Sequence, residues 1–125
     1  MPVYDNNGNL LINASAPVTA TCLVGTAVAL GVKNIKASPG SVYGLLVANK
    51  ASTIIYLQFY NTAGTPTLGT GVVWWVPIAV GATLAVPPTI FAMGSFSTGI
   101  GIGAATSAIG SGIPAVAPDV LIWYV

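Results

Sequence analysis

The sequence contains almost no charge. Its 125 residues include no histidine, no glutamate and no arginine, and charged residues make up 4% of the chain, against about 25% in a typical soluble domain. The charged side chains are Asp5, Lys33, Lys36, Lys50 and Asp119. General acid–base catalysis draws on paired titratable groups, and the two aspartates lie near opposite ends of the chain. We therefore predict no catalytic residues and no enzymatic activity.

The same scarcity argues against metals, cofactors and nucleic acid. Zinc needs histidine or several cysteines, and the polar run at residues 5–9 lacks the closing glutamate of a calcium loop. The glycines at 99, 101 and 103 do not have the spacing of a dinucleotide loop, and no helical pattern follows them. Three lysines neutralise few phosphates. We predict no cofactor, no metal site and no nucleic-acid partner.

Cysteine and membrane-spanning patterns are also scarce. Cys22 is alone, which rules out an internal disulfide, and we expect it to be a small buried residue. The start of the chain has no basic region before an apolar run, so it does not resemble a signal peptide. Residues 71–94 are long enough to cross a bilayer, but prolines at 77, 87 and 88 interrupt them. We predict no membrane span.

Apolar residues are abundant: hydrophobic side chains make up 54% of the chain, and the formal net charge is +1. A nearly neutral surface gives little mutual repulsion, and large uncharged patches usually mark contacts with other proteins or membranes. We therefore expect a homo-oligomer, a dimer or a trimer. The alternative is a neutral surface covered by Ser, Thr, Asn and Gly.

The clearest pattern lies between Ser41 and Tyr60. Ile55, Leu57 and Phe59 alternate with more polar residues, as in a strand with one buried side. A preceding apolar run ends at the turn-forming residues 49–52. We predict a central hairpin of two strands over residues 41–60.

Other short strands follow at intervals of about 8 to 12 residues. We predict them at residues 32–37, 72–78, 83–86, 89–93, 99–103 and 120–125, with a loop at 61–71. Residues 22–24 and 27–30 form one or two further short strands, and a brief helix is the alternative there. Pro77 either places its strand at a sheet edge or ends the strand. The alternating glycines near residue 101 leave one face bare, which suits close approach of a neighbouring sheet. This spacing predicts an all-β fold, an antiparallel β-sandwich or jelly-roll of about eight short strands.

The first 20 residues form a segment of their own. Asn7 and Gly8 lie between two short apolar runs, which is the usual sign of a tight hairpin, although an extended arm with one turn fits equally well. We divide the chain into an N-terminal arm or hairpin at residues 1–20 and one β-sandwich domain at 21–125. The candidate interface residues of the arm are Tyr4, Leu10, Leu11 and Ile12.

Trp74 and Trp75 are the remaining candidate interface residues. Neighbouring residues on a strand point to opposite faces, so one tryptophan is buried within the sheet's own layer and the other needs a second partner. We favour a subunit interface for the outer one. The alternative is a platform on which sugar rings stack, formed by Trp74, Trp75 and Tyr60.

Three stretches resemble a family of small virion proteins of tailed bacteriophages. They are Asn34 to Asn49 (NIKASPGSVYGLLVAN), Ile55 to Pro66 (IYLQFYNTAGTP) and Phe96 to Ile100 (FSTGI). The opening from Tyr4 to Leu11 is similar to the start of several phage virion proteins. The resemblance covers roughly residues 32–102, and the glycine- and isoleucine-rich segment beyond it has no counterpart. It implies a particle component with a jelly-roll-like fold and no enzymatic activity.

Composition and resemblance together suggest a capsid decoration, or cement, protein. Such a protein would sit on the exterior of the capsid, bind the major capsid protein and reach a neighbour with its arm. One alternative is a receptor- or carbohydrate-binding module of a tail fibre or spike. Another is a membrane-associated β-protein.

Overall fold

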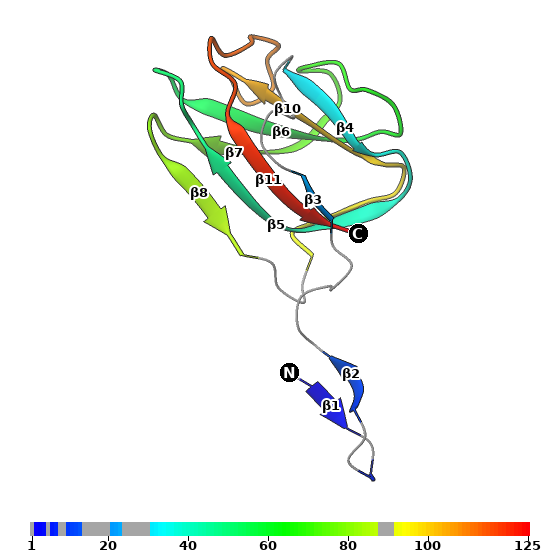
Figure 1. The fold of residues 1–125 in the computed structure, drawn as a ribbon. Coiled ribbons are helices and arrows are strands. Elements are labelled where there is room, and N and C mark those ends of the chain that lie inside the picture. The colour runs from blue at the N-terminus through cyan, green and yellow to red at the C-terminus, as the bar shows by residue number, and fades with distance from the viewer. Residues whose placement is uncertain (1, 5, 8–9, 14–20, 24–30, 88–91) are drawn as a thin grey trace.

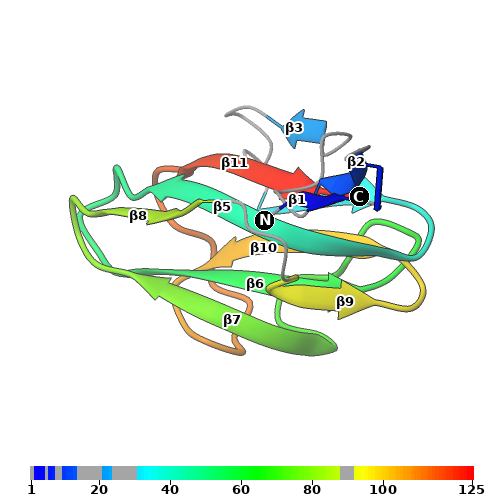
Figure 2. The same cartoon turned by 90° about the horizontal axis from the view of Figure 1, so that it is seen from below.

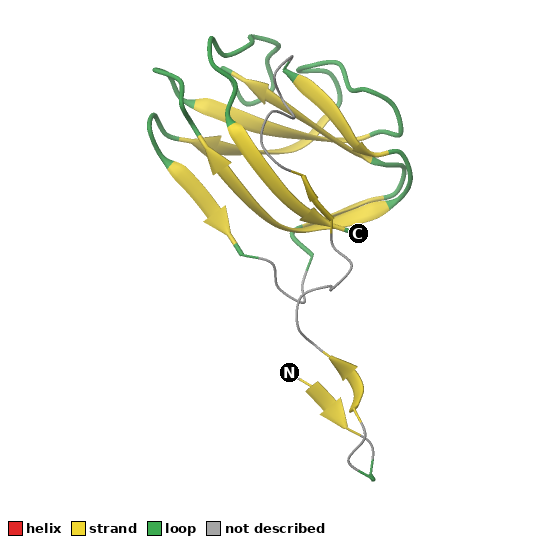
Figure 3. Cartoon of the chain, viewed as in Figure 1, coloured by secondary structure: helices red, strands yellow, loops and turns green. Residues whose placement is uncertain are grey.

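The computed structural model describes residues 2–4, 6–7, 10–13, 21–23, 31–87 and 92–125. Within these ranges the chain forms eleven strands and no helix, nine of the strands belonging to two antiparallel sheets that face each other (Figures 1 and 3). The predicted all-β sandwich is confirmed, whereas a jelly-roll connectivity is not. No helix long and apolar enough to cross a bilayer occurs in the described part of the chain.

The order of the strands within each sheet differs from their order in the sequence. The four-stranded sheet has the order β4 (Val32–Lys36), β10 (Ile100–Ala105), β6 (Ile55–Asn61) and β7 (Val72–Ile78). The five-stranded sheet begins with β3 (Thr21–Leu23), β11 (Asp119–Tyr124) and β5 (Gly40–Ala48). On the side of β5 away from β11, two short strands pair with it, β8 (Thr83–Val86) and β9 (Gly94–Phe96). Figure 2 shows the two layers from below. As Pro77 predicts, β7 is an edge strand.

The predicted central hairpin is wrong, although both of its strands exist. β5 belongs to the five-stranded sheet and β6 to the four-stranded one, so the connection at residues 49–54 crosses between the layers. Asn49, which is buried, holds this crossing in place. Its side-chain amide donates to the carbonyl oxygens of Thr53, Ile78 and Ala79, and its Oδ1 accepts from the N–H of Ala51.

The hydrophobic core fills the space between the two sheets. Ile55, Leu57 and Phe59 point inward from β6, as their alternation predicts, and are fully buried. The core also contains side chains from the opposite sheet, from β7 and from β10: Val42, Leu45, Val47, Ile78, Phe96, Ile100, Ile102, Ala104, Val120 and Ile122. Burial of a side chain of this size contributes about 1.5–3 kcal/mol, so this layer provides most of the stability.

The glycines of β10 do allow a close approach, but not by a neighbouring sheet. Ile100 and Ile102 point into the core, and a Cβ added at Gly101 would lie 3.1 Å from Pro66 Cγ. At Gly103 it would lie 2.7 Å from Leu68 Cδ1. The loop at residues 61–71 therefore rests directly on the bare outer face of β10, which corrects the prediction.

The predicted N-terminal hairpin is present. β1 (Pro2–Tyr4) pairs antiparallel with β2 (Leu10–Asn13) as a separate two-stranded sheet, drawn below the sandwich in Figure 1. Its role as a binding arm stays a prediction. The strand predicted at residues 27–30 lies outside the described residues, as does most of the one at 89–93, and the side chain of Cys22 is likewise not described.

Candidate interaction surface

The outer face of the four-stranded sheet has a covered half, which begins at Gln58. This residue lies on the face that the alternation of β6 assigns to solvent, yet it is fully buried. Its amide nitrogen donates to the carbonyl oxygens of Ser107, Ala108 and Gly110 at 3.2, 3.1 and 2.9 Å. One side chain thus ties the loop after β10 to the outside of the sheet.

Tyr60 completes the covered half, by which we mean Gln58, Tyr60 and the segments 61–71 and 107–110 that overlie them. The Tyr60 hydroxyl donates to Gln58 Oε1 and accepts from the N–H of Gly69 at 2.9 Å. Burial raises the pKa of Tyr60 above its usual 10.0, and the hydrogen bond from Gly69 partly offsets that rise. Because only 2% of Tyr60 is exposed, its ring is not available to stack on a sugar.

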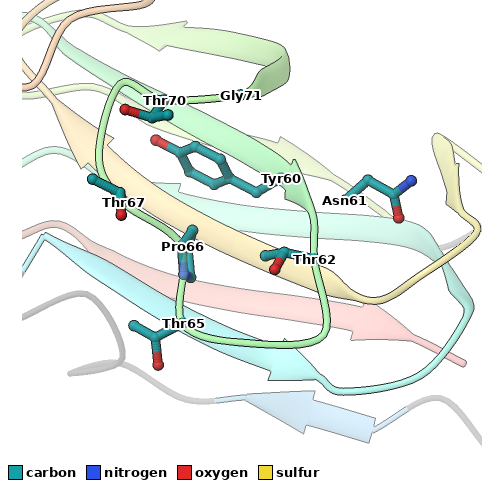
Figure 4. A pocket seen from close by; sticks show the side chains of 8 residues that line it. All are labelled: Tyr60, Asn61, Thr62, Thr65, Pro66, Thr67, Thr70 and Gly71. Carbon is teal, nitrogen blue, oxygen red and sulfur yellow. The ribbon is translucent and has the colours of Figure 1, made fainter.

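The 61–71 loop encloses a shallow hollow of about 300 Å³ (Figure 4). Its lining consists of residues 60–62, 65–67 and 70–71, which include four threonines and no charged side chain. Asn61 points away from the hollow in Figure 4, because its amide group bonds Ser97 Oγ and the N–H of Thr98. The lining offers hydroxyl groups but no acid, base or metal ligand.

The open half of the same face lies on β7 and carries large apolar groups. Val73 and Trp75 are 52% and 44% exposed, and Pro77 beside them is also exposed. Tyr56 meets Trp75 edge to face, with ring centroids 5.5 Å apart. We call Tyr56, Val73, Trp75 and Pro77 the β7 strip.

Trp74 lies on the opposite side of β7 from the β7 strip. Its ring stacks on Phe59 with centroids 3.8 Å apart and planes 7° apart, and it packs against the core. A Cβ added at Gly94 would lie 2.9 Å from Trp74 Nε1, so the ring sits directly beneath β9. The two tryptophans therefore separate as predicted, and Trp75 is the one on the outer surface.

The other candidate interface residues lie on the N-terminal hairpin. Tyr4 is opposite Leu10 and Val3 is opposite Ile12 in the β1–β2 register, and Leu11 lies between Leu10 and Ile12 on β2. The structure brings Tyr4 and Leu10 together on neighbouring strands. It does not join the hairpin to the β7 strip in one sheet.

The charged groups of the described residues include one ion pair. Lys50 Nζ pairs with Asp119 Oδ1 at 2.9 Å, and both side chains are about half exposed. Asp5 lies outside the described residues. Across the ranges that the structure describes, no cluster of His, Cys, Asp or Glu has the geometry to hold a metal ion.

Compared with models of protein families, with curated proteins and with solved structures, the chain matches none. The resemblance to phage virion proteins therefore stays a prediction. Function must be inferred from the chain's own surface.

Proposed function

We propose that this chain is a non-enzymatic structural protein of a phage particle, a decoration protein that forms a homo-oligomer and binds the major capsid protein on the capsid exterior. The observation that supports this proposal is the β7 strip, where an exposed tryptophan and valine lie in a region without charge. The resemblance of residues 34–49 and 55–66 to phage virion proteins is the reason for proposing the major capsid protein as the partner.

Trp75 has the properties of an interface anchor. Tryptophan is enriched among the residues that dominate binding energy, and charged residues are depleted from interface cores. Since residues 51–118 contain no charged side chain, a partner can cover the β7 strip without removing an ion from water. The strip therefore suits a contact with the apolar surface of another protein.

Cosedimentation with undecorated capsids of the parent phage tests the capsid role. We expect the wild-type protein to pellet with the shell and Trp75→Ser to bind at least about tenfold more weakly, since truncating a hot spot costs more than about 1.4 kcal/mol. Ile109→Ser is the matched control, because Ile109 is 70% exposed but lies outside the β7 strip. Wild-type protein that stays in the supernatant would refute the capsid role.

Deletion of residues 2–15 tests the arm separately. These residues include both strands of the N-terminal hairpin, and β1 and β2 pair only with each other. We expect the truncated protein to fold and to bind capsids more weakly. Unchanged binding would show that the hairpin is not the arm.

A second candidate function is a carbohydrate-binding module of a tail fibre or spike. It is favoured by one observation, the exposed ring of Trp75 with Tyr56 at its edge. Glycan-array binding that is lost in Trp75→Ala would support this function over the capsid role. Tyr60 and Trp74 play no part in it, because the first is buried and the second stacks on Phe59.

A further inference from the structure

The edges of the two sheets differ in how they resist pairing with another chain. Natural edge strands avoid such pairing with lysines, prolines or bulges. β4 carries Lys33 and Lys36 and has a register shift against β10. β7 contains Pro77 and has a register shift against β6. Both edges of the four-stranded sheet are therefore poor templates for a further strand.

β8, at one edge of the five-stranded sheet, has none of these features. Its residues Thr83–Val86 include no charge and no proline, and they pair with β5 without a register shift. In Figures 1 and 2 β8 lies at the margin of its sheet, with β5 on one side. The strand is short, but its outer side is a regular antiparallel edge.

The hydrogen bonding next to β8 shows which of its backbone groups face outward. The N–H of Asn49 donates to the carbonyl of Ala82 at 2.9 Å, which places residues 49 and 82 at a hydrogen-bonded position of the ladder, while the N–H of Ala82 donates to the carbonyl of Ala79 in the preceding turn. Hydrogen-bonded positions alternate along an antiparallel ladder. Leu84 and Val86 therefore bond to Val47 and Leu45, while Thr83 and Ala85 direct both N–H and C=O toward the open edge.

This pattern is self-complementary, and we propose that β8 pairs antiparallel with β8 of a second copy of this chain. Thr83 of one copy lies opposite Ala85 of the other, and each such pair exchanges both of its N–H···O bonds. The two-fold axis passes beside Leu84. Two five-stranded sheets become one continuous sheet in the dimer.

Side chains and charge fit the same arrangement. Leu84 is partly buried against the core, and in the dimer it lies opposite Leu84 of the second copy, which covers its remaining exposed surface. Thr83 and Ala85 project small side chains on the other face, so these two side chains leave room for the second copy. Lys50 and Asp119, near one end of this edge, already neutralise each other. Pro87 lacks an N–H and ends the ladder, so the paired region between the two copies is short. We therefore expect the dimer to dissociate on dilution.

This inference rests on the oligomerisation within the proposed function and names its surface. Light scattering over a range of concentrations compares the wild type with Ala85→Pro, which removes an outward N–H, and with Ala85→Ser, which keeps it. We expect a dimer for the wild type and for Ala85→Ser, and a dissociation constant raised about 30-fold for Ala85→Pro, because each dimer loses two hydrogen bonds.

Amide hydrogen exchange of the wild type provides a test that does not depend on the proline variant folding. In the dimer the N–H groups of Thr83 and Ala85 exchange slowly, and dilution removes their protection. The N–H groups of Leu84 and Val86, bonded to β5, stay protected at every concentration and serve as the internal control.

The outcomes separate this inference from the capsid role. A wild-type monomer at all concentrations, a trimer, an Ala85→Pro dimer as stable as the wild type, or fast exchange at Thr83 and Ala85 in the dimer each overturns β8 pairing. Pelleting with capsids in any of those cases leaves the capsid role standing. A β8 dimer that does not pellet with capsids supports the pairing and refutes the capsid role.

Discussion

The covered and open halves of the outer face differ in how each is shielded from water. In the covered half, Gln58 and Tyr60 bind the backbone of two loops, and the bare glycines of β10 let one loop lie against the sheet. In the open half, Val73 and Trp75 are about half exposed, and no loop of the described chain crosses them.

The difference shows what the chain needs in order to cover its own sheet. Loops bring backbone N–H and C=O groups with them, and these groups need polar partners once they are buried. Gln58 and Tyr60 provide such partners, whereas the β7 strip is mostly apolar, and its polar side-chain groups are the Tyr56 hydroxyl and the Trp75 indole N–H. A surface of that kind suits the side chains of another molecule better than a loop of its own.

The largest expected effect comes from filling the space under the loop. A Cβ at Gly103 would lie 2.7 Å from Leu68 Cδ1 and 2.9 Å from the carbonyl oxygen of Gly31, so Gly103→Ala forces the backbone apart. We expect a loss of about 1–3 kcal/mol in the free energy of unfolding, measured with urea. Gly101→Ala is the control, because its nearest contacts are side-chain atoms at 3.1 and 3.2 Å. Unchanged stability of Gly103→Ala would show that the loop does not rest closely on β10.

A smaller effect is expected from removing one hydroxyl group of the covered half. Tyr60→Phe keeps the ring but loses the bonds to Gln58 Oε1 and to the N–H of Gly69. We expect a loss of about 1 kcal/mol in urea unfolding, the typical net value for such bonds. Tyr56→Phe on the open half should leave stability within about 0.5 kcal/mol of the wild type. If the two substitutions changed the free energy of unfolding equally, the hydrogen bonds of the Tyr60 hydroxyl would not distinguish the covered half from the open half.

The covered half also predicts a dependence of stability on alkaline pH. Because burial raises the pKa of Tyr60 above 10.0, the folded chain keeps this proton at a pH where the unfolded chain has lost it. The unfolded state then binds fewer protons, so the free energy of unfolding falls as the pH rises above about 10. The contribution is fully present below the unfolded pKa and is lost as the pH passes the folded pKa. Thermal melts between pH 8 and 11 should show a flatter profile for Tyr60→Phe, and identical profiles would contradict the assignment.

The smallest effect on stability is expected in the open half. Trp75→Ala removes an edge-to-face contact with Tyr56 but creates no buried cavity, so we expect a change of about 0.5 kcal/mol in urea unfolding. A loss of several kcal/mol would mean that the Trp75 ring supports the fold, and the β7 strip would then be part of the protein's own structure.

Much of the sandwich can be predicted from local signals. The alternation of Ile55, Leu57 and Phe59 identifies β6 and its inner face, and Pro77 identifies an edge. The pairing of β5 with β6 fails, because alternation shows which side of a strand is buried but not which sheet holds the strand. Asn49 looks like an ordinary turn residue in the sequence, and its role in crossing between sheets depends on carbonyl groups about 30 residues away.

The surface is harder to predict than the core. Opposite placement of Trp74 and Trp75 follows from strand geometry alone, but which one faces outward depends on the position of Phe59. Gln58 looks solvent-exposed because its partners, at residues 107–110, are about 50 positions away. The open edge of β8 carries no motif at all. It becomes visible only when the hydrogen bond between Asn49 and Ala82 sets the alternation of the ladder.

The position of β11 has a consequence for how the protein folds during synthesis. This strand lies between β3 and β5, which precede it by about 100 and 75 residues. The five-stranded sheet therefore cannot close on the ribosome before residues 119–124 have emerged. Pairing over such sequence distances folds slowly, and until then the inner faces of β5 and β6 remain exposed to chaperones and to other copies of the chain.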